Sequence, residues 1–141
     1  MREYISNSPK ETEEIAASFA KELQRGDVIA YIGGLGAGKT AFTRGLATGL
    51  NVRGDVSSPT FALVHEYHGS PSLYHFDMYR INTIDDLYST GYFDYLDREE
   101  IMAVEWSENI SDVLDDNTIY VELIPLDETS RKIKIYGGNR F

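Results

Sequence analysis

The chain contains the stretch Gly33-Gly34-Leu35-Gly36-Ala37-Gly38-Lys39-Thr40, which matches the phosphate-binding loop pattern G-x-x-x-x-G-K-[ST] at every fixed position. Glycines let the backbone take conformations that bring several N–H groups to phosphate oxygens. The lysine of this pattern places a positive charge between the β- and γ-phosphates, and the hydroxyl of the last residue is a ligand of Mg²⁺. The stretch therefore predicts a site for a nucleoside triphosphate.

The segments on either side of the loop have the order that such a site needs. Residues 27–32 form a short and nearly continuous apolar run, which is typical of a strand buried on both faces of a parallel sheet. After the loop, Phe42, Leu46 and Leu50 recur four residues apart, which is helical spacing. The N-terminus of that helix would direct its free N–H groups and its positive dipole end at the phosphates.

The remaining patterns predict an α/β fold of the phosphate-loop NTPase kind. Alternating or apolar runs predict strands, and capping residues and helical spacing predict helices. The expected strands cover residues 2–6, 27–32, 60–67, 73–78, 101–106, 118–124 and 132–136. The expected helices begin near residues 9, 40, 84 and 107, and residues 91–96 form another short segment. We expect central parallel strands, antiparallel hairpins at the edges of the sheet, and helices on both faces.

The composition limits the classes of function. A chain of 141 residues is expected to form one domain over residues 1–141. It has no cysteine, which excludes disulfides and thiolate metal sites, and no apolar leader or membrane-length run, so a cytoplasmic protein is expected. The net charge of −10 argues against direct binding of RNA, which needs a basic surface. Any work on RNA would pass through a partner.

Two acidic residues follow predicted strands and are candidates for holding Mg²⁺. Asp77 ends one strand and Glu105 ends another, and the second strand is the more uniformly apolar. Phosphate-loop proteins commonly use an acid in such a place. The alternative for either residue is an ordinary strand end in solvent. The segment Ser57-Ser58-Pro59-Thr60 carries hydroxyl groups that could order around a γ-phosphate, although a simple turn before a strand is the other interpretation.

Four stretches together resemble the bacterial TsaE family, the small ATPases of tRNA threonylcarbamoyladenosine biosynthesis. They are the loop at 33–40, Ser58-Pro59-Thr60-Phe61, Tyr74-His75-Phe76-Asp77-Met78-Tyr79-Arg80 and Val104-Glu105-Trp106. The loop alone would indicate only a superfamily, and the combination is far more specific. The resemblance implies binding of ATP and Mg²⁺ and action beside the partner proteins TsaB and TsaD, which carry out the transfer to tRNA.

The resemblance also implies roles for individual residues. Thr40 and Glu105 would ligate Mg²⁺, Lys39 and Glu105 would act in hydrolysis, and either Asp77 or Thr60 would position the attacking water. Thr12 and Arg131 would approach the nucleotide from outside the loop. The implied nucleotide contacts are Thr12, Gly33, Leu35, Gly36, Ala37, Gly38, Lys39, Thr40, Ala41 and Arg131.

One position departs from the family pattern, which usually has Asp after the first loop glycine, where this chain has Gly34. The departure bears on the hydrolysis rate more than on nucleotide binding, because Lys39 and the loop N–H groups remain. Two other functions stay open on the sequence. One is a small-molecule kinase with the same loop, and the other is a nucleotide-gated interaction module in which hydrolysis is incidental.

Overall fold

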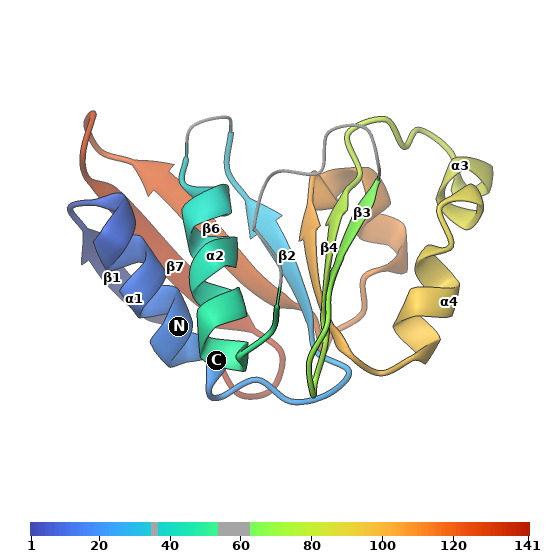
Figure 1. The fold of residues 1–141 in the computed structure, drawn as a ribbon. Helices are drawn as coiled ribbons and strands as arrows, with labels where there is room; N and C mark the ends of the chain where they lie inside the picture. The colour runs from blue at the N-terminus through green and yellow to red at the C-terminus, as the bar shows by residue number, and fades with distance from the viewer. Residues whose placement is uncertain (35–36, 54–62) are drawn as a thin grey trace.

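In a computed structural model, which describes residues 1–34, 37–53 and 63–141, the chain folds into one mixed sheet with helices on both faces (Figure 1). The strands are β1 (Arg2–Ser6), β2 (Val28–Ile32), β3 (Val64–Tyr67), β4 (Leu73–Asp77), β5 (Ile101–Glu105), β6 (Ile119–Pro125) and β7 (Arg131–Gly137). The helices are α1 (Pro9–Ala20), α2 (Lys39–Leu50), α3 (Ile84–Ser89), α4 (Tyr92–Asp97) and the 3₁₀ helix η1 (Ser107–Val113).

The sheet has seven strands in the order β1-β7-β6-β2-β5-β4-β3. β2 lies between β6 and β5 and is parallel to both, and β4 continues the parallel set beside β5. The β6–β7 and β3–β4 pairs are antiparallel, and β1 closes the other edge against β7. The predicted fold class is therefore confirmed, including the parallel centre and the antiparallel hairpins at the edges.

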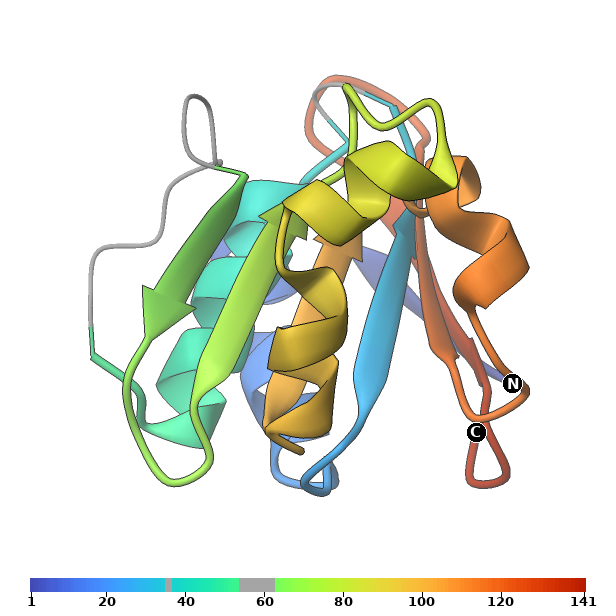
Figure 2. The ribbon, with the colours of Figure 1, turned by 90° about the vertical axis from the view of Figure 1, so that its right-hand side faces the viewer.

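The two faces of the sheet carry separate apolar cores. Helices α1 and α2 cover one face, where Phe42 of α2 packs in a core with strand residues such as Ile29 and Val121. Helices α3, α4 and η1 cover the other face, where Phe76 and Val104 are buried. Figure 2 shows α2 on one side of the sheet and the α3–α4 pair with η1 on the other. Strands β2, β4 and β5 contribute to both cores, which explains their nearly continuous apolar sequence.

Helix α1 starts where the sequence predicts. The Ser8 side chain accepts a hydrogen bond from the Glu11 backbone N–H at 3.1 Å, and the Glu11 carboxylate accepts one from the Asn7 N–H at 2.6 Å. Such caps satisfy N–H groups that have no partner within the helix. The helix ends at Ala20, so that Leu23, which continues the apolar spacing, lies in the turn beyond it.

The parallel arrangement decides where functional side chains can meet. The carboxyl ends of β2, β4 and β5 lie at the same edge of the sheet, since parallel strands end on the same side. In the α/β class, ligands bind outside that edge. The glycine loop leaves β2 there and leads into α2. In the described part of the chain, no helix has the length and apolar character to cross a membrane.

Candidate nucleotide-binding site

The glycine loop ends in a helix N-terminus. Gly38 is the N-cap of α2 with a left-handed φ of 104°, and no side chain caps the helix. The first N–H groups of α2 are thus available to an anion, and the helix dipole favours negative charge there. Within the loop, Ala37 and Ala41 are buried and Thr40 is half-buried. Leu35 and Gly36, two of the predicted nucleotide contacts, lie outside the described residues.

Lys39 is buried at the start of α2 and faces the end of β5. Its Nζ lies 3.5 Å from Oε1 of Glu105 and donates a hydrogen bond to the Gly33 carbonyl at 3.0 Å. The exposed fractions of Lys39 and Glu105 are 7% and 5%. Two predicted residues from distant parts of the sequence are thus brought together as a buried ion pair. A buried pair gains little net stability, because desolvation offsets much of the attraction.

The carboxylate of Glu105 also faces a buried histidine. Nε2 of His75 lies 2.6 Å from Oε2 of Glu105, and the imidazole is fully buried. Burial alone would raise the pKa of Glu105, but His75 and Lys39 lower it on balance. Glu105 is therefore a carboxylate held in its charged form.

The residues of this cluster fit a bound cation and phosphates. Neither Oε2 of Glu105 nor the ring nitrogens of His75 makes a well-aligned hydrogen bond with any described residue. Buried polar atoms normally have a partner. A charged carboxylate oxygen with remaining lone pairs, beside a threonine at the start of α2, is the donor type that Mg²⁺ takes. We therefore judge the donor set compatible with Mg²⁺ at Thr40 and Glu105.

Asp77 stands beside Glu105 at the same edge. The two residues are opposite one another in the parallel register of β4 and β5. Burial and the nearby charge of Glu105 raise the pKa of Asp77, and the hydrogen bond from the Tyr79 N–H offsets part of this rise. Its Oδ1 accepts a hydrogen bond from the Tyr79 backbone N–H at 2.9 Å. Both acids that the sequence left as alternatives thus lie in one site, at different depths.

The side chain of Trp106 covers the lysine. Its ring centroid lies 5.6 Å from Nζ of Lys39, within the range of a cation–π contact, and the Tyr79 ring packs on it at 5.0 Å between centroids. Trp106 has a left-handed φ of 57°, an uncommon conformation for a bulky residue. The side chain of Trp106 is thus half-buried over the site.

Two predicted contacts come from the α1 and β7 side. A Cβ atom on Gly38 would lie 3.0 Å from Cδ of Arg131, so the Arg131 side chain lies against the loop. Thr12 is fully buried and its hydroxyl is 2.7 Å from that of Ser6. Their roles in binding a nucleotide stay predictions. Thr60, the predicted switch hydroxyl, lies outside the described residues.

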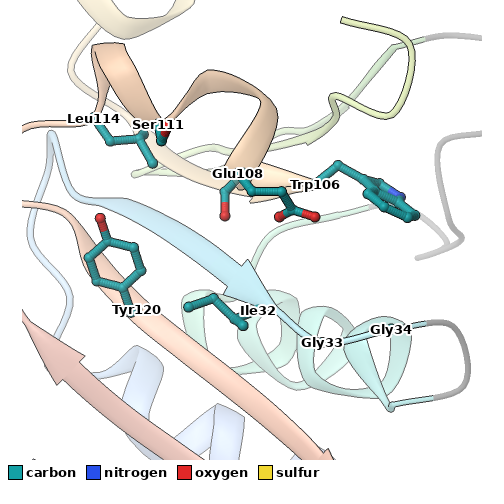
Figure 3. Close-up of a pocket in the computed structure, with 9 residues that line it drawn as sticks. Ile32, Gly33, Gly34, Trp106, Glu108, Ser111, Leu114 and Tyr120 are labelled. Carbon is teal, nitrogen blue, oxygen red and sulfur yellow. The ribbon is translucent and has the colours of Figure 1, made fainter.

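A pocket of about 450 Å³ opens next to the start of the loop, on the face of the sheet that carries η1. Figure 3 shows Trp106 and Tyr120 at opposite ends of this pocket, with Glu108 between them and Ile32, Gly33 and Gly34 below. The pocket and helix α2 therefore lie on opposite sides of the β2 end. A group bound in it would approach the loop from the side away from α2.

Comparison with known proteins decides the family. The family model for the threonylcarbamoyl adenosine biosynthesis protein TsaE matches residues 6–133. The chain belongs to the TsaE family. The TsaE protein of Aquifex aeolicus is 39% identical over 139 residues, covering 96% of each chain. That of Bacillus subtilis is 36% identical over 136 residues, covering 95% of this chain and 85% of the relative.

A solved structure supports the same assignment. The crystal structure of Bacillus subtilis YdiB superposes with a TM-score of 0.81 at 32% sequence identity, covering 99% of this chain and 88% of that one. The family name places the chain in tRNA threonylcarbamoyladenosine biosynthesis. The resemblance inferred from the four motifs is thereby confirmed, and so is the pathway.

One residue of the site was not assigned a role from the sequence. The three histidines of the chain lack the clustered spacing of a metal site, so their pattern in the sequence does not point to His75. A signal was nevertheless present, since His75 and Asp77 are two residues apart on a strand and so point to the same face. Its contact with Glu105 depends on the pairing of β4 with β5, which the sequence does not reveal.

Proposed function

We propose that the chain is a Mg²⁺-dependent ATPase that serves tRNA threonylcarbamoyladenosine biosynthesis in the cytoplasm by acting on a transferase assembly of TsaB and TsaD. The observation that carries the proposal is the meeting of Lys39, Glu105 and Asp77 at the N-terminus of α2. A phosphate-loop lysine, a charged carboxylate and a second acid are the groups that phosphoryl transfer to water requires.

In this proposal each residue of the chain has a separate task. The N–H groups of the loop and of the first turn of α2 bind the phosphate oxygens. Lys39 moves away from the Glu105 carboxylate and stabilises the charge on the transferring phosphoryl group. Thr40 and Glu105 would hold Mg²⁺, which would neutralise negative charge on the phosphates. Asp77, with its raised pKa, orients the attacking water, or Thr60 does so.

Slow hydrolysis by the isolated chain is expected, because the proposal places no arginine at the γ-phosphate. An arginine supplied by a partner accelerates phosphoryl transfer by about 10³–10⁵ in other phosphate-loop enzymes. The pocket between Trp106 and Tyr120 is an open approach to the loop. Stimulation by the TsaB–TsaD pair would therefore distinguish a working subunit from an enzyme that is complete by itself.

The test is steady-state ATP hydrolysis by the chain alone and with the TsaB–TsaD pair. We expect stimulation by the pair, and we expect Lys39→Ala and Glu105→Ala to lose at least about a hundredfold in turnover with the fold retained. Circular dichroism of each variant checks the fold. Unchanged turnover in either variant would remove the proposed role of that residue, and lack of stimulation would count against the partner assignment.

Two other functions are separated by simple measurements. A small-molecule kinase would transfer phosphate to an acceptor, so a screen of acceptors with ATP would detect a phosphorylated product. A nucleotide-gated interaction module would bind its partner differently with ATP, with ADP and without nucleotide, while Glu105→Ala would leave the biological output intact. The ATPase proposal expects no phosphorylated acceptor and a loss of output in Glu105→Ala.

A further inference from the structure

Three large side chains, on α3 and in the segment before it, are more than half exposed. Tyr79, Ile84 and Tyr88 are 61%, 52% and 64% exposed. Ile84 and Tyr88 are four residues apart on α3 and so share one face of it. Tyr79 lies in the segment between β4 and α3. We call these three residues the aromatic platform. Exposed aromatic and large apolar side chains are typical of protein-binding surfaces.

The platform lies in the part of the chain that carries most of the net charge. Residues 79–118 contain eleven acidic residues and two basic residues, Arg80 and Arg98, whereas the rest of the chain contains twelve acidic and eleven basic residues. The net charge of this segment is therefore −9, against −10 for the whole chain. Arg98 is itself paired with Glu66 at 3.4 Å.

Most of these acidic side chains are free to act on a partner. The exposed ones are Asp85, Asp94, Asp97, Glu99, Glu108, Asp112, Asp115 and Asp116. No described lysine or arginine forms an ion pair with any of them. They lie on α3, α4 and η1 or in the segments that follow α4 and η1, and these three helices cover the face of the sheet away from α1 and α2. This face thus carries many exposed acidic residues as well as the aromatic platform.

We propose that the aromatic platform and the acidic residues around it form the docking surface for a partner protein that presents an apolar patch ringed by lysine and arginine. The inference rests on the proposed function, in which such a partner is the basic protein assembly that holds tRNA. Charge complementarity identifies the occupant: an acidic face attracts a basic protein and repels RNA. The platform would supply the buried anchors of the contact.

The position of the platform connects the partner to the nucleotide site. The Tyr79 ring packs on Trp106, which covers Lys39. The backbone segment before α3 is also tied to the end of β5, because the Met78 N–H donates to the Glu105 carbonyl at 3.0 Å and Asn109 donates to the Met78 carbonyl at 2.8 Å. A partner that shifts Tyr79 would therefore act on the segment that carries Glu105.

The test measures binding of the TsaB–TsaD pair to the full chain and to two matched variants. Ile84→Ser with Tyr88→Ser removes the α3 part of the platform, and Ile5→Ser removes an equally exposed residue on β1 at the far edge of the sheet. We expect the platform variant to weaken binding about tenfold or more and Ile5→Ser to bind like the wild type. Basal hydrolysis and the affinity for a fluorescent ATP analogue should stay unchanged in both.

A second comparison tests the acidic residues. Asp94→Asn with Asp97→Asn should slow association several-fold and reduce its dependence on NaCl. The control pair, Glu14→Gln with Glu128→Gln, removes the same charge from exposed positions outside the acidic face and should leave both unchanged.

The outcomes separate the two proposals. If the wild type binds the pair and the platform variant binds equally well, or if the control variants lose as much, the docking surface lies elsewhere while the proposed function stands. If the wild type itself does not bind the pair, the proposed function fails and the inference fails with it. Selective loss in the platform and acidic-face variants supports the inference.

Discussion

At the scale of single residues, two glycines of the same loop differ in how strictly the structure requires glycine. Gly38 has a φ of 104°, and a Cβ on it would lie 3.0 Å from Cδ of Arg131. Gly34 does not have such a φ, and a Cβ on it would meet nothing within 4 Å. The loop therefore requires glycine at position 38 and tolerates a side chain at position 34, where the family usually has Asp.

This difference gives a prediction for alanine substitutions. Gly38→Ala should lower the free energy of unfolding by about 1–2 kcal/mol, because a left-handed backbone is strained for alanine, and should weaken ATP binding. Gly34→Ala should change unfolding by less than about 0.5 kcal/mol. Urea denaturation and titration with a fluorescent ATP analogue measure both effects. Equal losses in the two variants would mean that the loop conformation described for Gly38 is wrong.

At the scale of elements, α1 and α2 approach closely because α2 carries glycine at the contact. A Cβ on Gly45 would lie 2.3 Å from the carbonyl oxygen of Glu13 on α1 and 2.6 Å from Cβ of Ala16. Glycine in a helix interior is about 1 kcal/mol less favourable than alanine, and this cost permits the close contact. Close packing fixes the start of α2, and with it Lys39, relative to the sheet.

We therefore predict that Gly45→Ala destabilises the protein, although alanine is the better helix former. The expected loss is about 2 kcal/mol of unfolding free energy, since α1 and α2 must move apart. Thr48→Ala, at an exposed position of the same helix, serves as the control and should stay within about 0.5 kcal/mol. Urea denaturation curves compare the two. A stabilised Gly45→Ala protein would show that α1 can shift without cost.

At the scale of the whole molecule, the two apolar cores share the central strands and so should unfold together. Trp106 is the only tryptophan and packs with the core on the α3–α4–η1 face. Phe42 is fully buried in the core on the other face. Because β2, β4 and β5 contribute to both cores, neither core can open while the other stays intact.

Phe42→Leu should therefore shift the unfolding transition of Trp106 fluorescence and that of far-UV circular dichroism by the same amount. The expected loss is about 1–2 kcal/mol, as for a cavity left in a core. Coincidence of two probes is the test of two-state unfolding and of a single domain over residues 1–141. Separate midpoints in the variant would instead reveal two cooperative units.

Much of this molecule could be predicted from the sequence by itself. Periodicity and capping residues located the described strands and most of the helices to within a few residues, because burial and helix ends depend on residues near one another in the chain. The loop at 33–40 and the acids at strand ends identified Lys39, Asp77 and Glu105, because their chemistry can be recognised from residue type and position.

Only the tertiary structure decided which of these groups meet. The strand order β2-β5-β4 places Glu105 beside Lys39 and His75 beside Glu105. The packing of α3, α4 and η1 puts the exposed acidic residues of these helices on the same side of the sheet. Pairing between strands brings together residues as distant in the sequence as Arg2 and Ile135, and the packing of α2 on the sheet brings Lys39 to Glu105, 66 positions away. Local sequence patterns carry no record of such neighbours, since contact between them arises from the packing of the whole sheet.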